Sequence, residues 1–173
     1  MKALIVVDYV NQWLDKKSDY YLGNISKEIK NLNELIGYCR DRDIPVIFTT
    51  HIELKSEKDF VKGTNNVEII SKVDYKKGKD TLIKKNKISP FYKTQLEKKL
   101  DKLEAKELII VGILTNLCVR SLISDAYDKD YKITVIKDCC VAFSDELQEF
   151  TFKDIKDTRP EIKVYDTVEF IEK

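Results

Sequence analysis

Short apolar runs alternate along the chain with segments in which apolar residues recur every three or four positions. The runs end at charged or turn residues, as is typical of strands buried on both faces. They predict strands over residues 3–7, 46–50, 80–85, 107–112 and 132–136, with an edge strand over 163–166. The periodic segments predict helices over residues 25–43, 94–103, 116–130 and 144–157, the last opened by a serine N-cap.

This alternation predicts an α/β fold, because parallel strands need helical crossover connections. We expect a three-layer sandwich in which a mostly parallel, doubly wound sheet carries helices on both faces. Residues 52–79 are polar and rich in lysine, and they predict a long excursion with only short local structure. No linker, repeat or low-complexity tract interrupts the pattern, so we expect a single domain over residues 1–173.

Composition excludes several classes of protein. The 31 basic and 30 acidic residues give a formal charge of +1, which offers no general attraction to nucleic acid or to a membrane surface. The apolar run at the N-terminus is too short for a signal peptide, and no stretch approaches membrane length. The 4 cysteines show no C-x-x-C pair, so we expect reduced thiols and a cytoplasmic protein.

The candidate chemistry lies where the predicted strands end, since open parallel sheets bind ligands at that edge. The strand at 107–112 leads to Cys118, near the start of the next predicted helix. If Thr115 caps that helix, the helix dipole lowers the pKa of the Cys118 thiol, and a lysine nearby lowers it further. Cys118 is therefore a candidate nucleophile, although a cysteine at a helix start can also simply pack in the core.

Asp8 and a lysine are candidate partners for this thiol. Asp8 directly follows a wholly apolar strand, where a carboxylate acts either as a general base or as a cap for the following segment. The strand at 80–85 ends in two lysines, Lys84 and Lys85. Strand alternation directs only one of them to a given face and does not say which.

Other kinds of site find little support. No glycine-rich loop follows the first strand, and the single histidine, His51, follows no nucleophile-elbow motif. Glu53, Glu57 and Asp59 lie near His51 in the sequence. Zinc is nevertheless disfavoured, because zinc sites need several His, Cys or carboxylate ligands at fixed spacing.

Four segments in register resemble the isochorismatase-like cysteine hydrolases over nearly the whole chain. They are "VVDYVNQW", "KGTNNVEI", "KNKISPFYKTQLEKKL" and "VGILTNLCVRSLISDAYDKDYKITVIKDCCVAF". The third segment aligns Lys85, rather than Lys84, with the family's lysine. The resemblance implies a hydrolase that cleaves a C–N bond of a small carboxamide: Asp8 is the base, Lys85 positions the reacting groups, and Cys118 forms a thioester.

The resemblance also implies the surroundings of the nucleophile. It implies a cis peptide between Ile113 and Leu114, with the N–H groups of Leu114 and Cys118 as the oxyanion hole. Trp13 matches a pocket aromatic of the family and suggests a flat, partly apolar substrate, while a plain core tryptophan is the other interpretation. To the same substrate pocket we assign Asn11, His51 and Asn116.

The chain differs from the family at the residues that bind zinc, and this difference decides what we expect of a cofactor. Nicotinamidases of this family bind zinc through an aspartate and two histidines, whereas here Thr49 takes the aspartate position and His51 is the lone histidine. We therefore expect no cofactor. The alternatives are a vinyl ether hydrolase of the isochorismatase type, which generally lacks the cysteine, and a non-catalytic binding module. The resemblance further implies a small-molecule amide substrate and a homo-oligomer, a dimer or a tetramer.

Overall fold

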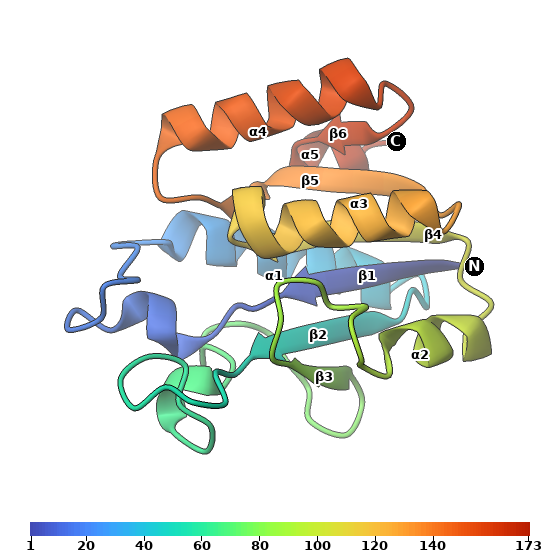
Figure 1. The fold of residues 1–173 in the computed structure, drawn as a ribbon. Coiled ribbons are helices and arrows are strands. Elements are labelled where there is room, and N and C mark those ends of the chain that lie inside the picture. Colours follow the sequence, from blue (N-terminus) through green and yellow to red (C-terminus); the bar gives the residue numbers. More distant parts are fainter.

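The computed structural model describes residues 1–173 and places a six-stranded parallel sheet at the centre of the molecule (Figure 1). The strands lie in the order β3-β2-β1-β4-β5-β6. Their bounds are Lys2–Val7 (β1), Val46–His51 (β2), Thr81–Lys85 (β3), Glu107–Ile113 (β4), Lys132–Val141 (β5) and Lys163–Tyr165 (β6). The α/β prediction is confirmed, including the edge position of the last strand.

Helices cover both faces of the sheet, as the alternation predicted. Helices α1 and α5 lie behind the sheet in Figure 1, and α2, α3 and α4 lie in front of it. Their bounds are Ser26–Arg40 (α1), Leu96–Lys102 (α2), Arg120–Asp128 (α3), Asp145–Thr158 (α4) and Thr167–Ile171 (α5), with short turns at Asn11–Leu14 (η1), Asn65–Val67 (η2) and Thr115–Val119 (η3). None of these helices has the length and apolar character needed to span a bilayer.

The centre of the sheet is apolar and buried. Strands β1 and β4 pair in parallel and are apolar almost throughout, and 44 buried side chains form one hydrophobic cluster around them. The predicted serine cap of α4 is confirmed, since the Ser144 hydroxyl accepts a hydrogen bond from the Leu147 N–H at 3.2 Å. The short helix α5, which the periodicity did not predict, is closed at its start by a capping box between Asp166 and Glu169.

The helix expected over residues 116–130 begins differently from the prediction. Its first turn, η3, is a π-helical turn, and the α-helix starts only at Arg120. Thr115 does not cap it: its buried hydroxyl donates instead to the Gln148 side chain on α4. Cys118 therefore lies in a wide turn of the kind that often occurs at functional sites.

Gly112 lies near the end of β4, just before this turn, and it is the one glycine at which the packing leaves no room for a side chain. Its φ is +144°, and a Cβ there would lie 2.4 Å from the Val7 carbonyl oxygen of β1. We expect Gly112→Ala to lower the free energy of unfolding by about 3 kcal/mol, because strain and the backbone clash add. Urea denaturation measures the change.

Gly37→Ala is the matched control for this prediction. Gly37 lies inside α1 with nothing near its position, so a methyl group there is expected to raise the free energy of unfolding by about 0.5–1 kcal/mol. Equal effects of the two substitutions on stability would contradict the role assigned to Gly112.

Candidate active site

Asp8, Lys85 and Cys118 meet at the carboxyl edge of the sheet. The Lys85 Nζ lies 2.6 Å from Asp8 Oδ2 and 3.3 Å from Cys118 Sγ. Asp8 follows β1, Lys85 is the last residue of β3, and Cys118 lies in η3 after β4. Lys85 is buried and Lys84 is exposed, so the strand register decides between the two lysines that alternation left open.

The Asp8 carboxylate is held in a defined orientation. Its φ of +53° places it in the left-handed region, which aspartate enters more readily than most residues. The Thr49 hydroxyl donates to Asp8 Oδ1 at 2.6 Å, and the Trp13 indole N–H donates to the Asp8 carbonyl oxygen at 2.6 Å. The side chain therefore points into the site and does not cap η1, whose first turn has no side-chain cap.

Lys85 remains an ammonium despite its burial. Burial by itself lowers its pKa, but the Asp8 carboxylate and the Cys118 sulfur outweigh this effect, and the pKa is raised overall. The charged pair of Asp8 and Lys85 is fully shielded from solvent. Removing either partner would leave an uncompensated buried charge.

The Cys118 thiol differs from the sequence prediction. Burial, the negative charge of Asp8 and the hydrogen bond to Asp8 together raise the pKa of Cys118 to about 12, although Lys85 lowers it. The helix-start argument was wrong about the direction because it considered only the turn and the lysine. The thiol is consequently protonated at rest, beside a carboxylate that can accept its proton.

A cavity of about 370 Å³ is lined by Asp8 and Cys118, whereas Lys85, which contacts both of them, does not line it. Trp13, Tyr20 and Phe60 form one wall, with ring centroids 5.1–6.2 Å apart and edge-to-face geometry. The other lining residues are Asp8, His51, Glu53, Asn86, Lys87, Ile88, Leu114, Leu117 and Cys118. Such a cavity suits a small, flat molecule.

Sequence reasoning assigned four residues to this pocket, and two of them line it. Trp13 and His51 line the cavity, and the Trp13 side chain is at the same time buried against the core. Asn11 and Asn116 do not line the cavity. The Asn11 amide turns away and donates to the Asn65 carbonyl oxygen at 2.9 Å, and Asn116 lies in η3 outside the lining set.

Two loops that supply the aromatic wall are joined by Gln12, which sequence reasoning did not select. Its buried side chain donates to Ser18 and to Asp59, each at 2.8 Å, and accepts from the Phe60 N–H at 2.8 Å. Neither Tyr20 nor Phe60 belongs to a periodic element, so no sequence pattern pointed to them. The contacts exist only because the chain folds residues 52–64 back onto residues 15–20.

The turn before Cys118 contains the cis peptide that the resemblance implied, between Ile113 and Leu114. The Leu114 carbonyl oxygen accepts hydrogen bonds from the N–H groups of Leu117 and Val119, both at 3.1 Å. The assignment of the Leu114 and Cys118 N–H groups to an oxyanion hole stays a prediction.

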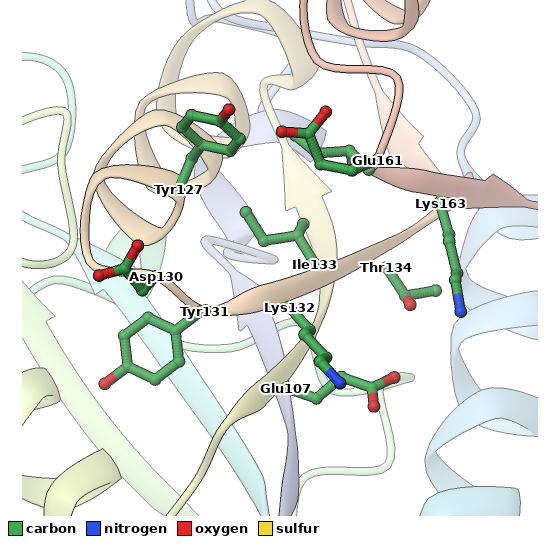
Figure 2. Close-up of a pocket in the computed structure, with 10 residues that line it drawn as sticks. Glu107, Tyr127, Asp130, Tyr131, Lys132, Ile133, Thr134, Glu161 and Lys163 are labelled. Atoms are coloured by element: carbon green, nitrogen blue, oxygen red, sulfur yellow. The ribbon is translucent and has the colours of Figure 1, made fainter.

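A second cavity, of about 510 Å³, lies at the opposite edge of the sheet (Figure 2). It surrounds the amino ends of β4 and β5, with Glu107 and Lys132 on one side and Tyr127 and Glu161 on the other. No thiol lines it. The thiol, the carboxylate and the ammonium come together at the carboxyl edge of the sheet.

Comparison with known proteins identifies the family of the chain. A family model for the isochorismatase domain matches residues 2–165. The chain belongs to the isochorismatase family. Among curated relatives of this isochorismatase-family hydrolase, "Nicotinamidase 3" of Arabidopsis thaliana is 30% identical over 167 residues, covering 88% of this chain and 79% of the relative.

Solved structures share the fold over almost the entire chain. An isochorismatase-like hydrolase from Alkaliphilus metalliredigens has a TM-score of 0.88 at 24% identity, with 99% of this chain and 97% of that one covered. The pyrazinamidase of Pyrococcus horikoshii, in complex with zinc, has a TM-score of 0.84 at 22% identity, with 95% of this chain and 98% of that one covered. At these identities the structures establish the isochorismatase-like fold.

Proposed function

We propose that this chain is a cysteine hydrolase that cleaves the C–N bond of a small carboxamide through a thioester. The observation that carries the proposal is the contact of Lys85 with Asp8 and Cys118, at 2.6 Å and 3.3 Å, because these two partners both line the cavity. A thiol, a carboxylate base and a fixed cation are the groups that this chemistry needs. The relatives named nicotinamidase and pyrazinamidase support an amide as substrate.

The reaction follows from the protonation states at rest. Asp8 takes the proton of the Cys118 thiol as the sulfur attacks the carbonyl carbon, and the carbonyl oxygen becomes an oxyanion. The C–N bond breaks as the proton passes from Asp8 to the departing nitrogen, which leaves as ammonia or an amine. Water then attacks the thioester carbon, gives a proton to Asp8, and releases the acid; that proton returns to the Cys118 sulfur.

Lys85 stabilises the negative charge throughout this cycle. In the resting site the charge lies on Asp8, and during attack it shifts toward the sulfur and the oxyanion. The ammonium contacts the Asp8 carboxylate and the sulfur, so it need not move as the charge shifts. Fixed charges in a water-poor site stabilise such steps more than solvent does.

The experiment that tests the proposal is ammonia release from a panel of amides. The panel contains nicotinamide, benzamide, a ureido compound and acetamide. Because the wall of Trp13, Tyr20 and Phe60 is aromatic, we expect a ring carboxamide to show kcat/KM at least about tenfold above that of acetamide.

Intact-mass measurement during turnover provides the second readout. The acyl group is expected as an adduct on Cys118 that disappears when the substrate is exhausted. If no member of the panel releases ammonia and none acylates the protein, hydrolysis of these carboxamides is refuted.

A further inference from the structure

The Lys85 ammonium has more partners than the proposed reaction uses. Besides Asp8 and Cys118, its Nζ lies 3.3 Å from His51 Nδ1 and 3.1 Å from the Lys87 carbonyl oxygen. An ammonium has three hydrogens, so these four neighbours share them and together fix the position of the ammonium. Of the two additional partners, only His51 is a side chain, and it is the single histidine of the chain.

His51 is itself held from the other side. His51 Nε2 lies 2.7 Å from Glu53 Oε1, and the edge of the imidazole packs on Phe60. Because Nδ1 faces an ammonium that can only donate, the ring proton belongs on Nε2, where the Glu53 carboxylate accepts it. The strand register pairs His51 with Lys85 on neighbouring strands, which keeps the two side chains adjacent.

The same residues do not fit a metal ion. Both ring nitrogens of His51 already have partners, and one of those partners is a cation that would repel a metal. No group of three His, Cys, Asp or Glu side chains has the geometry for a metal. Thr49, which stands where zinc-binding relatives carry an aspartate by resemblance, uses its hydroxyl to orient Asp8. Zinc sites in proteins are built from three or four His, Cys or carboxylate ligands, a set that His51 does not have around it.

We propose that Glu53 and His51 form a positioning dyad for Lys85, in place of a metal ion. Glu53 holds the Nε2–H tautomer of His51, and the free Nδ1 accepts a hydrogen bond from the ammonium. The ammonium is thereby aimed at Asp8 and Cys118, and hydrolysis proceeds without a divalent metal. The catalytic part of this inference rests on the proposed function, whereas the tautomer and the absence of a metal site do not.

Nitrogen NMR of the lone histidine tests the dyad without any substrate. With ¹⁵N-labelled protein, we expect the His51 ring in the Nε2–H form, and Glu53→Leu is expected to give a mixture of tautomers. Glu57→Leu is the matched control, because Glu57 is an exposed carboxylate on the same loop, and it should leave the signals unchanged. A ring in the Nδ1–H form would refute the dyad.

Substitutions of His51 test its action on Lys85. His51→Phe fills the ring's volume but offers no acceptor, and we expect kcat to fall about 10- to 100-fold as the ammonium loses its direction. His51→Asn places a carboxamide oxygen near the lost Nδ1 and is expected to recover most of that loss. If His51→Phe retains the wild-type kcat, the residue only packs and the positioning role is wrong.

Zinc titration tests the metal-free part of the inference. We expect calorimetry to show no stoichiometric zinc site and dialysis against EDTA to leave kcat unchanged. One zinc bound per chain in the wild type, lost in His51→Phe, would overturn the inference. Because NMR and calorimetry need no turnover, a failure of the dyad is distinguishable from a failure of amide hydrolysis.

Discussion

Replacing Cys118 with alanine is expected to reduce hydrolysis of the best amide in the panel by about 10⁴- to 10⁶-fold, the loss typical of removing a covalent nucleophile. The fold should survive, because the Cys118 side chain lines the cavity and only partly packs against the core. Initial rates of ammonia release measure the loss, and intact mass should show no acyl adduct.

Cys39→Ala is the matched control for this prediction. Cys39 is buried on α1, away from the cavity, and its pKa is likewise raised to about 12 by burial. Its removal is expected to cost stability and leave kcat unchanged. Amide hydrolysis that persisted in Cys118→Ala would refute the thioester, whereas cleavage of a vinyl ether by that variant would favour a hydrolase of the isochorismatase type.

Replacing Asp8 with asparagine is expected to change catalysis and thiol reactivity in opposite directions. Hydrolysis should fall about 10²- to 10⁴-fold, since the amide cannot take the Cys118 proton. Alkylation of Cys118 by iodoacetamide should become faster. Both effects of Asp8 on the thiol, its charge and its hydrogen bond, raise the Cys118 pKa, whereas the remaining neighbour Lys85 lowers it.

The raised pKa of Cys118 also predicts how the rate of alkylation depends on pH. The wild-type pKa of about 12 leaves Cys118 almost wholly protonated at pH 8, so it should alkylate more slowly than a free cysteine, whose pKa is about 8.5. The alkylation rate should rise about tenfold per pH unit from pH 7 upward. In Asp8→Asn the same rise should occur at lower pH.

Intact mass after limited labelling measures this reactivity at one site, because Cys39, Cys139 and Cys140 are buried and should stay unlabelled. Cys118→Ala under the same conditions gives the background. Slower alkylation in Asp8→Asn than in the wild type would mean that Asp8 activates the resting thiol, contrary to the protonation states proposed here.

Hydrophobic patterning was sufficient for the architecture. The strands and helices occur close to their expected ranges, and the cap at Ser144 is present, because buried runs, helical stripes and capping residues are local signals. The exceptions are helix α5, the extension of β5 to Val141 and the π-helical turn that contains Cys118. In this π-helical turn the Thr115 hydroxyl bonds to Gln148 on α4, a contact between segments distant in sequence, which no local pattern encodes.

The sequence by itself determined the fold class and indicated the three candidate side chains of the site. Asp8 and Cys118 follow the ends of predicted strands, and the alignment with the family's motif selected Lys85 rather than Lys84. Only the tertiary structure decided their electrostatics and the shape of the cavity. The Cys118 pKa depends on burial and on a carboxylate far away in the chain, and Tyr20 and Phe60 meet only when two loops fold together. Proximity of this kind arises from packing across the whole domain, whereas sequence patterns report on neighbours along the chain.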